Sequence, residues 1–323
     1  MPSILRRKKS NNKIPIKEKI VKRTSGIVHL THNDLDAAGS DAFCRMKYGE
    51  DVLTFFSSVG RYPWFLSQIA SCAGKGDTLF ITDLSYNKSA EDAVRKISAA
   101  GWKIIWLDHH KWTDEEKKKT ASYIDTLIVD TSKCAAGIAY SYFKPENEKA
   151  AEIAKVVCDY DLWKHEDPRS AVLGIITSGN KNLRLVRDKF TDGIIIDDEI
   201  EQIYKKIESD KNRCIKKSRK HTKIYEGRYK IAVMPAYGYP SETAAENRKF
   251  FGSDIELLVF DNGKFSVRSV PDISHLIAKE FGGGGHPNAA GGSFTFKTID
   301  KIRFKLLGRI RCADKFIEAA EKL

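Results

Sequence analysis

The chain has 323 residues, of which 41% are apolar and 30% charged, as is typical of a globular protein with two domains. No apolar run approaches the ~20 residues needed to cross a bilayer, and the basic, polar start lacks the apolar core of a secretory signal. We therefore expect a cytoplasmic protein with no membrane partner.

The net charge of +12 favours a polyanionic partner such as nucleic acid. Part of this charge lies in residues 1–23, which we expect to be a basic, disordered arm. The six cysteines are scattered and none has C-x-x-C spacing, so we expect reduced thiols with packing roles.

In residues 27–130, β-rich runs alternate with helical stretches, which predicts a parallel sheet with right-handed crossovers. The expected strands are Ile27–Thr31, Asp51–Phe56, Asp77–Thr82, Lys103–Leu107 and Thr126–Val129. Helical segments are expected near 39–48 and 88–99.

Residues 145–222 have mainly helical character, and Asp197–Lys223 could form one long helix joining two domains. A second α/β region follows. Its expected elements are strand Tyr229–Met234, helix Ser241–Phe251, a hairpin at Asn262-Gly263, helix Asp272–Glu280, a Gly282–Gly285 loop, a strand near Gly292–Phe296 and a final helix from Ile299. The predicted organisation is a basic arm (1–23), a parallel-sheet domain (24–165), a helical linker (166–227) and a smaller domain with a mixed sheet (228–323).

Acidic and imidazole residues follow four of the predicted strands. They are His32, Asp34 and Asp36 after the first, Asp83 after the third, Asp108, His109 and His110 after the fourth, and Asp130 after the fifth. Each aspartate taken singly suits a helix cap or a turn. Together, however, they should meet at the carboxyl edge of one sheet.

Carboxylates that crowd together at one edge cannot all stay ionised without cations. Two divalent metals would supply the missing positive charge, and the mixture of carboxylates with imidazoles suits Mn²⁺, with Mg²⁺ or Co²⁺ as alternatives. In a locally extended segment His32, Asp34 and Asp36 would share one face and serve the same metal pair.

These motifs, in this order, resemble the DHH phosphoesterase superfamily. The stretch from Phe281 to Gly291, with its run of glycines before His286, resembles the associated DHHA1 domain. Within the superfamily, Thr31–Asp36 and Asp159–Lys164 are most similar to the NrnB group of oligoribonucleases. One departure is Ala37, where family members usually have glycine, and a position that required positive φ would strain an alanine.

The resemblance implies the roles of individual residues. One metal would be held by His32, Asp34 and Asp83, and the other by Asp36, Asp83, His109 and Asp130. Asp108 and His110 would act behind the ligands or on the transition state. The substrate would be bound by Arg268, Gly283, Gly284, Gly285 and His286. Tyr237 and Tyr239 could stack on bases or simply pack.

The function that this resemblance implies is metal-dependent hydrolysis of short single-stranded oligonucleotides, in which two metals activate the attacking water. A 3′→5′ exonuclease of very short RNA is the leading reading, with removal of the 3′-phosphate from adenosine 3′,5′-bisphosphate as a further activity. Hydrolysis of cyclic or linear dinucleotides, a pyrophosphatase and a non-catalytic nucleic-acid-binding protein are the alternatives. The sequence leaves open whether the substrate is RNA or DNA and whether the chain forms a homodimer.

Overall fold

The computed structural model describes residues 14–308, 310 and 313–323, and the chain divides into two compact units between Tyr204 and Lys205. The division falls inside helix α10 (Asp198–Lys220), so the long helix expected at 197–223 is present. In the part of the chain that the structure describes, no helix is both long and apolar enough to span a bilayer.

Unit 1 is built on a parallel five-stranded sheet with strand order β2-β1-β3-β4-β5. Its strands are β1 (Ile27–Thr31), β2 (Leu53–Phe56), β3 (Thr78–Thr82), β4 (Lys103–Asp108) and β5 (Thr126–Val129). The inner strands β1 and β3 are buried almost throughout because helices cover both faces of the sheet. The expected parallel α/β domain is therefore confirmed.

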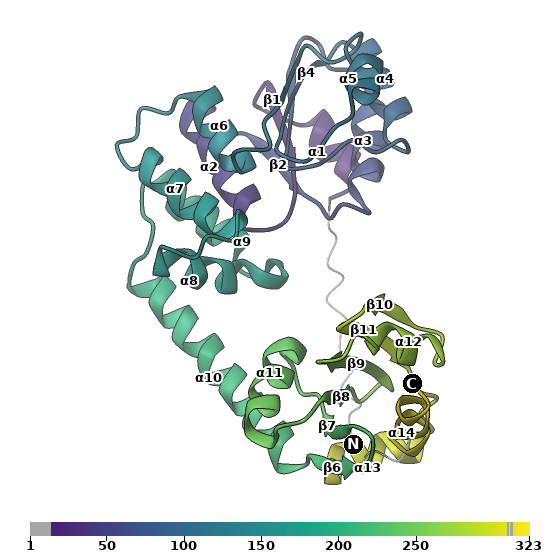
Figure 1. Ribbon diagram of the computed structural model, residues 1–323. Coiled ribbons are helices and arrows are strands. Elements are labelled where there is room, and N and C mark those ends of the chain that lie inside the picture. Colours follow the sequence, from purple (N-terminus) through teal and green to yellow (C-terminus); the bar gives the residue numbers. More distant parts are fainter. Residues whose placement is uncertain (1–13, 309, 311–312) are drawn as a thin grey trace, which may run out of the picture. The chain divides into compact units, whose positions relative to one another are not determined.

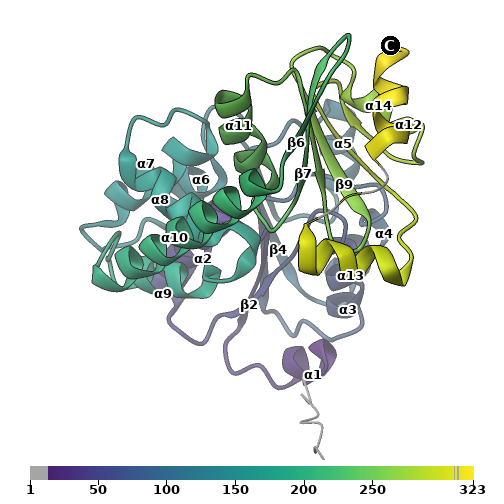
Figure 2. The ribbon, with the colours of Figure 1, turned by 90° about the horizontal axis from the view of Figure 1, so that it is seen from below.

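Helices lie on both sides of this sheet (Figures 1 and 2). Toward one side lie α1 (Ile16–Val21), α3 (Tyr62–Ala70), α4 (Glu91–Ala99) and α5 (Asp114–Thr120). Toward the other lie α2 (Leu35–Tyr48), α6 (Ala135–Phe143), α7 (Ala150–Asp161), α8 (Pro168–Thr177) and α9 (Leu183–Thr191), with a short 3₁₀ turn at Ser178–Asn180.

Two segments differ from their expected roles. Part of the expected disordered arm forms helix α1, whose Ile20 is fully buried in the core of unit 1; residues 1–13 of that arm lie outside the described residues. Residues expected to begin the linker form α8 and α9 of unit 1. There Arg187 of α9 donates to the buried Asp41 of α2 at 2.7 Å, so a charge pair joins this segment to the sheet domain.

Unit 2 contains a mixed six-stranded sheet with strand order β10-β11-β9-β8-β7-β6, as the expected smaller α/β domain requires. The strands are β6 (Lys223–Glu226), β7 (Lys230–Pro235), β8 (Ile255–Val259), β9 (Lys264–Ser269), β10 (Gly284–His286) and β11 (Ala289–Ser293). The helices are α11 (Pro240–Phe251), α12 (Ser274–Lys279), α13 (Thr298–Leu307) and α14 (Ala313–Glu321). Alternation along β7 buries Ile231 and Val233 in one apolar cluster and Ala232 and Met234 in another, on opposite faces.

Candidate metal centre

The carboxyl ends of β1, β3 and β4 lie side by side because these strands are neighbours in a parallel sheet. His32 follows β1, Asp83 follows β3 and His109 follows β4. Asp83 has a left-handed backbone, with φ of 55°, a conformation that aspartate tolerates better than most residues. The predicted meeting of these side chains therefore occurs.

Asp83 lies at the middle of the group. Its Oδ2 is 3.5 Å from Nδ1 of His32, and its Oδ1 is 3.3 Å from Nε2 of His109. Three overlapping sets of side chains each place ligand atoms within 4.8 Å of one another. The sets are His32, Asp34 and Asp83; Asp83, His109 and His110; and Asp36, His109 and Asp161.

Asp34 and Asp36 come from the start of helix α2. Asp34 is its N-cap, accepting a hydrogen bond from the Ala37 amide at 3.1 Å, while its other oxygen is 2.6 Å from Nδ1 of His32. Ala37 lies inside the helix and is not among the residues with positive φ, so the alanine in place of the family's usual glycine brings no backbone strain.

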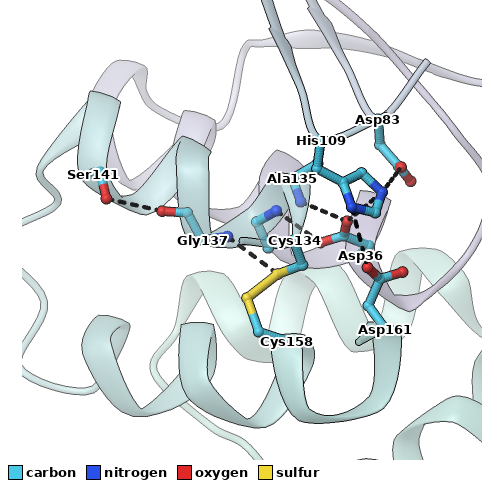
Figure 3. Close-up of a disulfide and its surroundings, with 10 residues drawn as sticks. Asp36, Asp83, His109, Cys134, Ala135, Gly137, Ser141, Cys158 and Asp161 are labelled. Atoms are coloured by element: carbon cyan, nitrogen blue, oxygen red, sulfur yellow. Dashed lines mark hydrogen bonds and ion pairs between the residues drawn. A yellow bond between two sulfur atoms is a disulfide. The ribbon is translucent and has the colours of Figure 1, made fainter. Parts of the chain in front are cut away.

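The Asp36 carboxylate is buried against the first turn of α6. It accepts hydrogen bonds from the amides of Ala135 and Ala136, both at 2.7 Å, and its Oδ2 is 3.9 Å from Nε2 of His109 (Figure 3). The two helices approach closely at Gly39, where a Cβ would meet the Cβ of Ala136 at 2.9 Å.

Asp161 completes this side of the group, a role that the strand-end reasoning did not assign to it. It ends helix α7, and its Oδ2 is 3.6 Å from Nδ1 of His109 (Figure 3). The sequence signal was the Asp159-Tyr160-Asp161 segment. Asp159 braces the turn after α7, accepting from the amides of Glu166 and Asp167 and from the Ser170 hydroxyl.

Asp130 does not join these groups. Its Oδ1 accepts from the amide and the hydroxyl of Ser132, at 3.0 and 2.5 Å, and its Oδ2 is 3.6 Å from the Lys133 ammonium. The carboxylate is thus occupied by the turn that follows β5, and it belongs to none of the three ligand sets found among the described residues.

His110 is held from behind by a fully buried aspartate. Asp108 lies 2.8 Å from Nδ1 of His110 and accepts a second hydrogen bond, of 2.7 Å, from the indole of Trp112. Asp108 therefore orients the His110 ring and raises its pKa, in spite of the opposing effect of burial.

Crowding perturbs the acidic groups in the direction expected of a cation site. Burial raises the pKa of Asp36 and Asp83, and neighbouring carboxylates add to the rise. Burial also raises the pKa of Asp161 to about 6, although His109 opposes the shift. Asp83 Oδ2 and Asp161 Oδ2 are buried without any hydrogen-bond partner. Two buried carboxylate oxygens that accept no hydrogen bond, each beside an imidazole, are a donor set that fits divalent cations.

A disulfide joins two helices directly behind this group. Cys134, the N-cap of α6, is bonded to Cys158 of α7 (Figure 3). The expectation of reduced thiols is therefore wrong for this pair, because scattered positions in the sequence meet where two helices pack. Cys44, Cys72 and Cys214 are free thiols, and Cys312 lies outside the described residues.

The residues expected to bind substrate lie on adjacent strands of unit 2. Ala289 of β11 pairs with His286 of β10 on one side and with Arg268 of β9 on the other, so the three form a row on one face of the sheet. Arg268 donates to two hydroxyls, those of Ser266 at 2.8 Å and Ser241 at 3.1 Å, and has no acidic partner among the described residues.

The glycines expected to form a loop are partly in the edge strand β10. Gly283 lies just before it, where a Cβ would be 2.0 Å from the Gly291 oxygen, and a Cβ at Gly285 would be 2.6 Å from the Ala289 oxygen. The close approach of β10 to β11 thus explains two of the glycines. Tyr237 packs near Phe304 under the Lys217 ammonium, and Tyr239 precedes α11.

A parallel sheet whose carboxyl edge gathers aspartates and histidines suits a metal-dependent hydrolase. The sequence model described as "DHH family, N-terminal domain" matches residues 26–162, which span that edge. Residues 26–162 therefore form a domain similar to the amino-terminal domain of the DHH family.

Comparisons with whole proteins find similarity beyond this domain. It is 26% identical over 296 residues to the oligoribonuclease NrnB of Bacillus subtilis, across 83% of this chain and 73% of that protein. Two solved structures share the fold, each with a TM-score of 0.53. The pGpG-specific phosphodiesterase PggH of Vibrio cholerae is 12% identical, with 91% of this chain and 99% of that chain covered. The exonuclease RecJ bound to manganese is 16% identical, with 94% and 92% covered.

Proposed function

We propose that the chain hydrolyses the phosphodiester bonds of short single-stranded RNA at a centre of two divalent cations. The observation that carries this proposal is the group around Asp83, where carboxylates and imidazoles from separate strands and helices meet. The 26% identity to an oligoribonuclease supports a short RNA substrate, and the net charge of +12 suits a polyanion.

Each cation would have its own ligands, with Asp83 contributing to both. His32, Asp34 and Asp83 would hold one ion, and Asp36, Asp83, His109 and Asp161 the other. This assignment keeps the expected ligands except Asp130, whose carboxylate is bonded to Ser132. Mn²⁺ suits a set of carboxylates and imidazoles, and the related RecJ fold was solved bound to manganese.

When bound, two divalent ions supply Lewis-acid activation of water and neutralise charge on the phosphoryl oxygens. The chain's own groups fix the geometry around them. The two amides of α6 hold Asp36, and Asp108 orients His110, which is half-exposed and can donate a hydrogen bond to the phosphoryl group.

In unit 2, the Arg268 and His286 row would bind a phosphate of the substrate. Arg268 is a cation without a carboxylate partner among the described residues, and its guanidinium can bind a phosphate through two parallel hydrogen bonds. Burial and the neighbouring Arg248 lower the pKa of Arg268, so an anionic ligand would relieve the repulsion between them.

A product profile tests this function. The purified chain with Mn²⁺ would be offered RNA and DNA of two to twenty nucleotides, linear and cyclic dinucleotides, and adenosine 3′,5′-bisphosphate. We expect the shortest RNAs to be cleaved to mononucleotides, with rates falling as length increases. Preferred cleavage of a dinucleotide such as pGpG would identify a dinucleotide phosphodiesterase instead. Binding of RNA without turnover of any phosphoester would identify a binding protein.

A further inference from the structure

A cavity of about 590 Å³ adjoins the ligand loop in unit 1. Asn33, which stands between the ligands His32 and Asp34, lines it together with the carboxyl end of β2, the start of α3 and residues 180–184. A ligand in this cavity would therefore lie next to the proposed metal centre. None of the residues expected to bind substrate from the sequence lines it.

The cavity is cationic. Lys19, Arg61, Lys181 and Arg184 line it, all four are exposed, and no aspartate or glutamate is among the lining residues. None of the four has an ion-pair partner in the described part of the chain, whereas nearby Arg187 and Lys189 are both paired with carboxylates. Unpaired cations around one hollow attract an anion more strongly than a solvated surface does.

Aromatic side chains alternate with these cations. Trp64 of α3 is 43% exposed, even with the Arg61 guanidinium 5.0 Å from the centre of its ring. Phe56 and Phe65 also line the cavity. Cations that follow a phosphate backbone, together with an exposed ring on which a base can stack, are the combination that binds single-stranded nucleic acid without sequence preference.

We propose that this cavity is a subsite for a nucleotide of the single-stranded substrate adjoining the scissile phosphate, with its base against Trp64 and its phosphates on Lys181 and Arg184. The inference rests on the proposed function and adds a second place, separate from Arg268, where the chain binds its substrate. The subsite concerns affinity and not the rate of cleavage: a pentanucleotide offers these cations more phosphates than a dinucleotide does, so it should bind there more tightly.

Binding without turnover tests the subsite. Fluorescein-labelled pentaadenylate would be titrated in EDTA into the wild type, Trp64→Ala and the double variant Lys181→Ala/Arg184→Ala. We expect each change to weaken binding roughly tenfold. The double variant should also reduce the slope of log affinity against log salt by about 1.4, as loss of two phosphate contacts requires. Trp64→Ala should leave the slope unchanged.

Two controls match these variants. Lys117→Ala/Lys118→Ala removes two cations from α5 of the same unit, and neither lysine forms an ion pair with another described residue. Phe250→Ala removes an exposed aromatic of unit 2 that also carries a stacked arginine, with Arg219 at 4.3 Å. Both should bind within about twofold of the wild type, and circular dichroism would confirm folding of every variant.

The outcomes separate the subsite from the function. If the two subsite variants bind like the wild type, or if the lysine control weakens binding as much, the subsite is wrong, even where the wild type cleaves RNA with Mn²⁺. If binding depends on the subsite but no RNA is cleaved, the subsite stands and the proposed function fails. Absence of binding by the wild type in low salt would also overturn the subsite.

Discussion

At the scale of single residues, two aspartates distinguish the proposed ligand set from the one that the sequence predicts. Asp161 is partly buried and reaches His109, whereas Asp130 is bonded to Ser132 at the surface of its turn. Both side chains are carboxylates, so only their positions in the structure separate a proposed ligand from a residue that holds a turn.

Replacement of each aspartate by asparagine tests this distinction. Asp161→Asn should lower kcat/KM for a dinucleotide roughly a hundredfold or more, because a cation would lose a carboxylate ligand. Asp130→Asn should change it by less than about threefold. Steady-state rates at saturating Mn²⁺ give the comparison. Equal damage from both substitutions would restore Asp130 as a ligand.

The sequence could predict the ligands that follow strands but not the one that ends a helix. His32, Asp83 and His109 are found because parallel strands deliver their carboxyl ends to one edge. Asp161 lies at the end of α7, and its approach to His109 depends on how α7 packs on α2, which no local pattern encodes. Asp130 was expected among the ligands because it also follows a strand. The position after a strand does not reveal which way the side chain points, and that of Asp130 is bonded to Ser132.

At the scale of elements, a buried charge network fastens helices α2 and α9 to the sheet. Asp41 of α2 is fully buried and contacts His29 of β1 at 2.7 Å, Arg45 at 3.2 Å and Arg187 of α9 at 2.7 Å. Although burial alone would raise it, the hydrogen bond from His29 and the two arginines lower the pKa of Asp41 below its ordinary 3.8.

Asp41→Asn should therefore destabilise the fold strongly. Two buried guanidinium groups would lose their shared carboxylate, at a cost of about 3–5 kcal/mol. Urea unfolding at pH 7 measures the change, and Asp92→Asn, which removes the exposed ion pairs with Arg95 and Lys96, should destabilise the fold far less. Equal stability of the two variants would mean that the network contributes little.

The wild type and Asp41→Asn should also differ in how their stability depends on pH in acid. Because the folded pKa of Asp41 lies below the unfolded value, its contribution is complete above pH 3.8 and is lost as the pH falls further. The wild type should consequently lose stability on acidification below about pH 4 more steeply than Asp41→Asn does. Parallel acid limbs in urea titrations would contradict the assigned shift.

The disulfide should stabilise the helices that support Asp36 and Asp161. It closes a loop between positions 24 residues apart, for which loss of the bond costs about 3 kcal/mol. Cys134→Ser/Cys158→Ser should thus lower the melting temperature, and dithiothreitol should lower that of the wild type but not of the double variant. A wild-type melting temperature indifferent to reductant would show that the bond does not form in solution.

At the scale of the whole molecule, periodicity and turn residues predicted the two α/β regions and the long helix between them. The periodicity of apolar residues does not predict the short helices α3 and α6. Helix α3 contains Pro63 within its first turn, and α6 is rich in small apolar residues that give no clear polar face. The boundary between units was also not readable, since α8 and α9 resemble linker helices until their buried contacts with α2 are known.

The central claim is that Asp83 and its neighbours hold two divalent cations. Crystals of the full chain soaked in Mn²⁺, with data collected at the manganese absorption edge, test it most directly. We predict two anomalous peaks, both adjoining Asp83, one beside His32 and Asp34 and the other beside His109 and Asp161. Absence of any peak at Asp83, or manganese bound at Asp130 instead, would contradict the account.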